Sequence, residues 1–150
     1  IKELEQEGII HTERAGNAFL CTLTGKFNEK VFYAEYQRRQ DILKNKDLKT
    51  ILQRYKQAKQ SYILLLFGSY VKGTNTKQSD IDLLAITNDK EEIEEITKLI
   101  PKDIHLTTVN YEEFLRMKQS KELSVVNETI KNNIILIGIE EYYRLINNGG

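Results

Sequence analysis

Apolar residues follow different patterns in the two halves of the chain. From residue 32 to residue 60 no glycine or proline occurs, and apolar side chains recur at a spacing near 3.6 residues, with gaps. This spacing predicts one long helix, or two helices joined near Asn45. In the second half, short apolar runs alternate with amphipathic segments. That alternation is typical of buried strands connected by helices.

The apolar runs predict four strands, at residues 63–67, 81–86, 104–109 and 134–137. Helices are expected between and after them, over residues 91–99, from 110 onward with a continuation over 121–132, and over 140–146. Asn88 or Asp89 begins the first of these helices and Pro101 ends it. Asn110-Tyr-Glu-Glu113 has the spacing of a capping box and begins the second.

The first 24 residues have their own pattern. Residues 1–8 are expected to form the end of a helix that Gly8 stops, and residues 9–12 and 18–24 to form two short strands around a turn. This arrangement resembles the tail of a winged helix-turn-helix domain, whose recognition helix would lie upstream. The abrupt start and the late single methionine, Met117, indicate that residue 1 is not the natural start. We expect three parts, residues 1–25, a basic connection over 26–60, and a domain over 61–150.

Charge is balanced overall but uneven along the chain. The 22 basic and 22 acidic residues give no net charge, so no global field attracts nucleic acid or membrane. Residues 26–61 contain ten basic and four acidic residues, and residues 89–95 are acidic. Such runs are typical of solvated helix faces. The alternative is that the basic stretch neutralises DNA phosphates.

Cysteine content and hydropathy indicate the compartment. A single cysteine, Cys21, excludes an internal disulfide and fits a reducing compartment. No apolar run approaches the roughly 18 residues of a membrane span, and no signal-peptide pattern opens the chain. We therefore expect a cytoplasmic protein without a membrane-spanning segment.

The chemistry-bearing residues gather in the segment 66–84. Gly68-Ser69 follows the first apolar run, and Asp80 and Asp82 stand at the second. Side chains at positions i and i+2 of a strand share a face, so the two carboxylates are expected to point together. Gly68 allows a phosphate close to the backbone, and Ser69 offers a hydroxyl and an N–H at a helix start. Paired carboxylates beside such a turn suit divalent cations and a nucleoside triphosphate.

This motif resembles the signature of the DNA polymerase β-like nucleotidyltransferase superfamily, and its minimal members most of all. Gly73 and Ser79 match further positions of that signature, and Lys72 stands where a basic residue is usual. The resemblance implies an α/β (α+β) fold with a mixed central sheet flanked by helices. It also implies phosphate binding by Gly68, Ser69, Lys72, Gly73 and Ser79. Mg²⁺ or Mn²⁺ would be held by Asp80 and Asp82, in a two-metal arrangement.

The same superfamily brings a third carboxylate from a later strand. Asp103, at the entrance to the run 104–109, is the candidate for this third metal ligand and catalytic residue. The alternative is a turn residue that follows Pro101-Lys102. His105 lies two positions further on the same strand face, where it would support a ligand, act as a base, or simply be packed or exposed.

The resemblance implies an enzyme that moves a nucleoside monophosphate from an NTP, with ATP expected, to an acceptor hydroxyl. The acceptor is a protein, an RNA end or a small molecule, and a partner protein or a second copy would help to bind it. The chain also resembles predicted transcriptional regulators fused to a nucleotidyltransferase domain. This resemblance rests on the winged-helix-like start and on two segments near the end, Val109–Phe114 and Ile134–Gly138. The alternatives are a DNA-binding regulator that senses nucleotide and an inactive antitoxin-like member.

Overall fold

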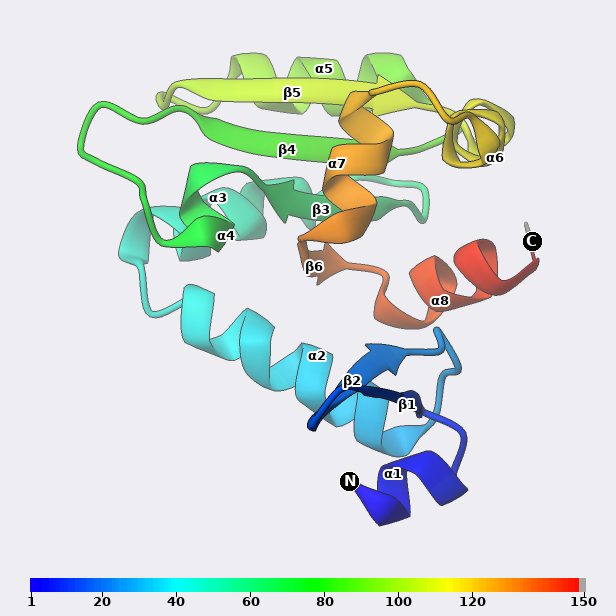
Figure 1. The fold of residues 1–150 in the computed structure, drawn as a ribbon. Coiled ribbons are helices and arrows are strands. Elements are labelled where there is room, and N and C mark those ends of the chain that lie inside the picture. Colours follow the sequence, from blue (N-terminus) through cyan, green and yellow to red (C-terminus); the bar gives the residue numbers. More distant parts are fainter. Residues whose placement is uncertain (149–150) are drawn as a thin grey trace.

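The computed structural model describes residues 1–148 and contains a four-stranded mixed sheet (Figure 1). The strand order is β5-β4-β3-β6, in which β4 and β5 run parallel and the other two pairs are antiparallel. The bounds are those predicted from the apolar runs: β3 Ile63–Phe67, β4 Ile81–Ile86, β5 Ile104–Val109 and β6 Ile134–Ile137. Helices flank the sheet, so the predicted fold class is confirmed.

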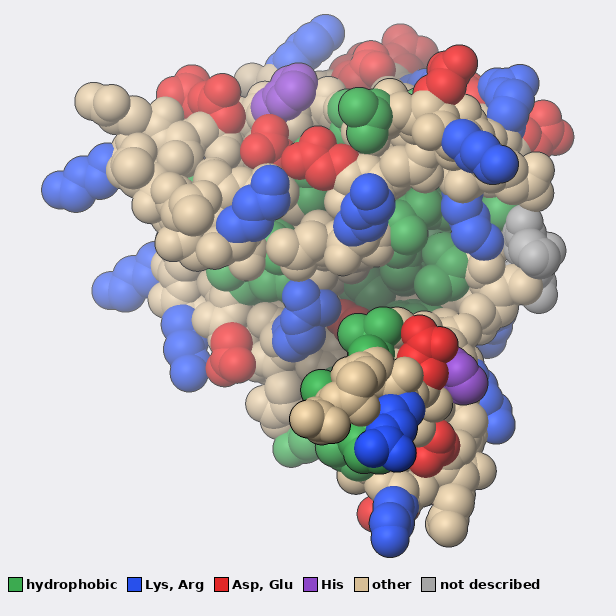
Figure 2. Space-filling view, viewed as in Figure 1, with side chains coloured by type: hydrophobic (Ala, Val, Ile, Leu, Met, Phe, Trp, Pro, Cys, Tyr) green, Lys and Arg blue, Asp and Glu red, His purple; other side chains and the backbone are tan. Residues whose placement is uncertain are grey.

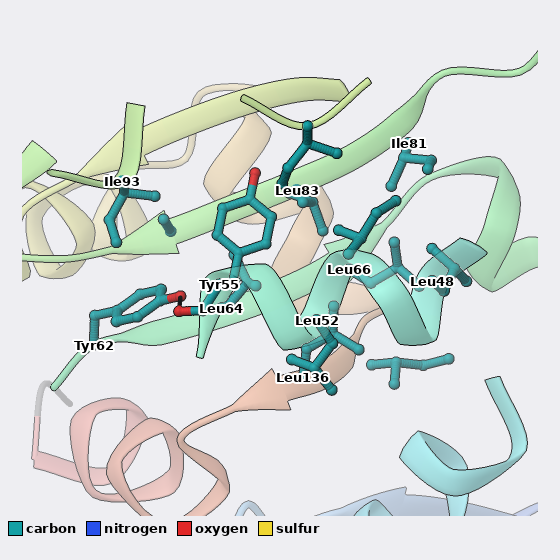
Figure 3. Packing of buried hydrophobic residues seen from close by; sticks show 14 residues of the cluster. Leu48, Leu52, Tyr55, Tyr62, Leu64, Leu66, Ile81, Leu83, Ile93 and Leu136 are labelled. Carbon is teal, nitrogen blue, oxygen red and sulfur yellow. Dashed lines mark hydrogen bonds between the residues drawn. The ribbon is translucent and has the colours of Figure 1, made fainter. Parts of the chain in front are cut away.

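One face of the sheet is covered by α3 (Lys46–Tyr55) and α5 (Lys90–Lys98). Figure 3 shows this layer, in which Leu48 and Leu52 of α3 lie against Leu64 and Leu66 of β3. At its edge the Tyr62 hydroxyl donates a hydrogen bond of 2.7 Å to the Tyr55 carbonyl. Four buried residues of α3 thus belong to the core of the sheet domain.

The other face is covered by α6 (Tyr111–Gln119), α7 (Val125–Lys131) and α8 (Ile139–Asn148). Phe114, Val126 and Tyr142 pack there against Leu65 and Leu84 of the strands. Because β3 is buried on both faces, all five of its residues are apolar and almost fully buried. The central strand is therefore held from both sides.

Side-chain caps decide where several helices begin. The Asn45 side chain accepts hydrogen bonds from the backbone N–H groups of Asp47 and Leu48, which starts α3. Residues 32–60 therefore form two helices, α2 (Glu29–Ile42) and α3, as one of the two sequence interpretations predicts. Asp89 and Asn110 cap α5 and α6 at the predicted positions.

The predicted helical continuation over 121–132 is wrong in its first part. Helix α6 ends at Gln119, and α7 begins only after Ser124, whose hydroxyl accepts a hydrogen bond from Asn127 N–H. The Asn127 side chain also donates to the carbonyls of Ser120 and Glu122. These bonds satisfy the backbone of the connection without a helical turn.

The N-terminal segment forms α1 (Lys2–Gln6) and a hairpin of β1 (Ile10–Ala15) and β2 (Ala18–Leu23). The hairpin turn is shorter than expected, because β1 continues to Ala15 and the turn is closed by Gly16 at φ +63°. Lys30 of α2 joins α2 to α1, with Nζ 2.7 Å from carboxylate oxygens of Glu3 in α1 and of Glu7 at its C-terminal cap. The predicted helix end and hairpin are found, while their assignment to a winged-helix domain stays a prediction.

A hollow of about 440 Å³ separates the N-terminal lobe from the sheet domain. It lies between the hairpin, α2 and α8, and Figure 2 shows hydrophobic side chains along it. Across the junction, the Tyr143 hydroxyl of α8 donates a 2.8 Å hydrogen bond to Glu35 of α2. No helix within residues 1–148 is long and apolar enough to cross a bilayer.

The pair of buried tyrosines generates a prediction about alkaline stability. Burial raises the pKa of Tyr62 and of Tyr55 above the ordinary tyrosine value. Above pH about 10 the unfolded chain releases protons that the folded chain retains, so the free energy of unfolding is expected to fall with rising pH. Urea unfolding between pH 8 and pH 11 measures this decline.

Two variants separate the ionisation from the hydrogen bond. Tyr62→Phe removes the bond to the Tyr55 carbonyl and is expected to cost about 1 kcal/mol at neutral pH. The same variant is expected to lose stability less steeply above pH about 10. Tyr33→Phe, at an exposed position, serves as the control. An unchanged slope in Tyr62→Phe would contradict the assignment.

Candidate functional site

The turn after β3 has the strand–turn–helix form expected from the sequence. Gly68 adopts φ +75° and ψ −147°, a backbone region that is essentially restricted to glycine. Its carbonyl accepts hydrogen bonds of 3.1 Å from the N–H groups of Val71 and Lys72, which closes the short helix α4 (Ser69–Lys72). Gly73 ends this turn in the left-handed conformation, at φ +74°.

Asp82 packs its carboxylate against the backbone of Gly68. The two lie together because Asp82 is paired with Phe67 in the antiparallel register of β3 and β4. A Cβ atom at Gly68 would overlap Asp82 Oδ2 and lie 3.0 Å from Asp82 Cγ. The Asp82 side chain is only 25% exposed. A glycine at position 68 is therefore required by the neighbouring carboxylate as well as by the backbone angles.

Asp80 is exposed and stands immediately before β4 rather than inside it. The next residue, Ile81, donates its N–H to the Asp103 carbonyl over 2.9 Å, which extends the parallel ladder between β4 and β5. Asp80 and Asp103 are thus backbone neighbours at the entrance to the two strands. Asp82 therefore lies beside the Gly68 turn, and the predicted pairing of the Asp80 carboxylate with it stays a prediction.

Ser79 has a structural role in the loop that precedes Asp80. Its hydroxyl accepts a 2.8 Å hydrogen bond from Thr76 N–H, and its own N–H donates to the Thr76 carbonyl over 3.1 Å. These two bonds fold residues 76–79 into a tight turn. The predicted contact of Ser79 with phosphate stays a prediction.

The β5 residue that reaches Asp82 is His105, since these two residues are partners in the parallel register. His105 Nδ1 lies 3.2 Å from Asp82 Oδ1. Asp103 is exposed and lines a polar hollow together with Lys77, Ser79 and other residues. The structure places Asp103 at the entrance to β5, as expected. Within residues 1–148 no group of three or more His, Cys, Asp or Glu side chains comes together in a way that could hold a metal ion.

Lys72 lies at the end of α4 with a partner that sequence reasoning missed. Its Nζ is 3.9 Å from Glu128 Oε1 of α7, and both side chains are about half exposed, at 54%. An exposed pair at this distance contributes about 0 to 1 kcal/mol to stability. Glu128 carries no motif, and only the packing of α7 on the sheet brings it to this place.

Comparison with known proteins agrees with this arrangement. The family model described as a nucleotidyltransferase domain matches residues 46–137, which is more than half of the chain. The chain belongs to this family. The match begins at the first residue of α3 and ends at the last residue of β6. No curated protein and no solved structure matched the chain.

Family membership indicates nucleotidyl transfer as the general activity and an NTP as substrate. The donor atoms at the site suit a divalent cation of the kind this family usually uses. Mg²⁺ is commonly held in enzymes by one or two carboxylates together with substrate phosphates, without a cage made only of protein atoms. Asp82 supplies one carboxylate beside the Gly68 turn, and Asp80 stands two residues before it.

The contact between Asp82 and Gly68 generates a prediction about stability. Gly68→Ala introduces a Cβ into the Asp82 carboxylate and an unfavourable backbone conformation, with an expected loss of about 3 kcal/mol or more. Gly73→Ala is the matched control, because Gly73 also has a positive φ but has no atom within 4 Å of an added Cβ. Its expected cost is about 1 to 2 kcal/mol. Urea unfolding of both variants provides the comparison, and equal losses would contradict the close contact.

Proposed function

We propose that the chain is a divalent-cation-dependent nucleotidyltransferase that moves a nucleoside monophosphate from an NTP, with ATP expected, to an acceptor hydroxyl. The transfer forms a bond between the acceptor oxygen and the α-phosphorus and releases pyrophosphate. The acceptor belongs to a protein, an RNA end or a small molecule. The observation that carries the proposal is the Asp82 carboxylate held against the backbone of the Gly68 turn.

Asp80 and Asp82 are proposed to hold Mg²⁺ or Mn²⁺ together with the phosphates of the nucleotide. A cation held there would neutralise phosphate charge and make the attacking hydroxyl more acidic. Asp103 is the proposed third carboxylate and stands beside Asp80 in the extended ladder. The gap between Asp103 and the Asp82 carboxylate must then be bridged through water or by movement of the entrance loop.

The turn around Gly68 is proposed to bind the triphosphate. Gly68 leaves its own N–H and that of Ser69 open to a close approach, and the Ser69 hydroxyl adds a donor. Lys72 provides a positive charge when a phosphate replaces its ion-pair partner Glu128. Lys77 provides a second positive charge from the loop between Gly73 and Ser79. These three donors and two positive charges, all within residues 68–77, are suited to a polyanion.

Transfer of labelled NTP tests this proposal. The protein is incubated with Mg²⁺ or Mn²⁺ and each α-labelled NTP, with and without a cell extract that supplies acceptors. Asp80→Asn and Asp82→Asn are expected to lower transfer at least about 100-fold, because each removes a carboxylate from the cation site. Nucleotide binding, measured by equilibrium dialysis, is expected to weaken in the same variants.

Asp41→Asn is the matched control, since Asp41 is 69% exposed and pairs only with Lys44 in the contacts described. Asp103→Asn distinguishes a third ligand from a turn residue, since a turn residue would leave transfer within about twofold of wild type. Transfer unaffected by Asp80→Asn and Asp82→Asn, or no NTP binding by the wild-type protein, would overturn the proposal. NTP binding without transfer to any acceptor would favour a nucleotide sensor.

A second candidate function is DNA binding by a regulator that senses nucleotide through this fold. The observation that favours it is the exposed β1–β2 hairpin, which carries Arg14 near its tip. Such a surface would bind backbone phosphates, with an affinity that falls steeply as salt rises. Arg14→Ala is expected to weaken binding to duplex DNA severalfold at 50 mM salt, measured by fluorescence anisotropy.

The control for DNA binding is Lys121→Ala, at an exposed position far from the hairpin in sequence. Retention of full DNA affinity by Arg14→Ala would exclude the hairpin as the contact. An inactive antitoxin-like protein would bind neither NTP nor DNA in these two assays.

A further inference from the structure

The residue that stands beside Asp82 on the neighbouring strand is a histidine. β4 and β5 are parallel, and their register pairs Asp82 with His105. The side chains share a face of the sheet, and His105 Nδ1 lies 3.2 Å from Asp82 Oδ1. His105 is 65% exposed, so a ligand in solution reaches its ring without any movement of the core.

This separation suits two atoms bound to one cation. Neighbouring ligand atoms of an octahedral ion, each about 2.1 Å from the metal, are about 3.0 Å apart. In the ion-free chain the Nδ1–H group would donate to the carboxylate, and the same nitrogen becomes an electron-pair donor when Nε2 carries the proton. The pair is therefore preformed for a cation as well as for a hydrogen bond.

We propose that His105 supplies a nitrogen ligand to the divalent cation at Asp82, and that this nitrogen shifts the metal preference from Mg²⁺ toward transition-metal ions such as Mn²⁺. The inference rests on the function proposed above. Carboxylate, phosphate and water oxygens suit Mg²⁺, whereas an imidazole nitrogen binds first-row transition metals more strongly. Asp82 and His105 alone supply two ligand atoms and do not form a complete site. Asp80, the nucleotide phosphates and water would complete the coordination.

The same geometry would serve a residue that only orients Asp82 by a hydrogen bond. Such a positioning residue never bonds to the metal, so a direct probe of the metal's ligands distinguishes the two roles. Mn²⁺ provides this probe, because pulsed electron paramagnetic resonance detects the magnetic nuclei of its ligands. A bound imidazole gives a strong nitrogen coupling, and bound ATP gives a phosphorus coupling.

The experiment uses the whole chain with Mn²⁺ and ATP. The chain has two histidines, so His11→Ala is the matched control for His105→Ala. His11 is exposed on β1, away from the sheet domain. We expect nitrogen and phosphorus couplings in wild type and in His11→Ala. In His105→Ala the strong nitrogen coupling should vanish, and the affinity for Mn²⁺ should fall about tenfold.

His105→Asp allows a second measurement, of metal preference, because it replaces the nitrogen ligand by an oxygen ligand and does not remove it. An oxygen donor at this position is expected to lower the ratio of Mn²⁺ to Mg²⁺ affinity by about tenfold, measured by competition of Mg²⁺ with bound Mn²⁺. Circular dichroism shows that each variant is folded.

Three outcomes are distinguishable. Loss of nitrogen coupling in His105→Ala alone supports the inference. Phosphorus coupling without strong nitrogen coupling in wild type, or nitrogen coupling that survives in His105→Ala, overturns the inference and leaves the proposed nucleotidyl transfer intact. No binding of Mn²⁺ and ATP by the folded wild-type chain overturns both.

Discussion

The approach of the Asp82 carboxylate to the backbone of Gly68 is the constraint on which the site depends. It requires the pairing of Phe67 with Asp82 at the ends of β3 and β4. A shift of this register by one residue would turn Asp82 to the opposite face of the sheet, toward the apolar layer of α3 and α5. Such a shift is opposed because it would bury the Asp82 carboxylate among apolar side chains without a partner. Core packing and site geometry are therefore specified by the same pairing.

The two-sided burial of the sheet supports the site in a second way. β3 is enclosed between α3 on one face and α7 and α8 on the other. The turn that follows β3 begins at the end of this rigid strand, so Gly68 and α4 have a fixed starting point. α7 also brings Glu128 to Lys72, with which it forms an exposed and weak ion pair. The scaffold is closely packed, while the residues proposed to meet the phosphates remain accessible.

The contacts of the basic residues near the N-terminus help to decide whether the chain also binds DNA. Several basic residues of the stretch 26–61 already have partners inside the chain: Lys30 contacts Glu3 and Glu7, Arg38 contacts Glu35, and Arg39 donates to the Leu136 carbonyl. These contacts agree better with a solvated helix face than with a continuous DNA-binding surface. The hairpin with Arg14 is left as the surface that would reach a duplex. Nucleotidyl transfer is accordingly the better supported of the two functions.

The sequence by itself determined the features that depend on neighbouring residues. Apolar runs located all four strands of the sheet. Asn110, and Asn88 or Asp89, located the starts of two helices, and the segment 66–84 located the Gly68 turn and its carboxylates. Only the tertiary structure decided which distant residues meet. The register of β5 beside β4 brings His105 to Asp82, the polar bonds around Ser124 interrupt the helix after Gln119, and α7 brings Glu128 to Lys72. The physical reason is that strand register and helix docking are set by packing across the whole core, which no local pattern records.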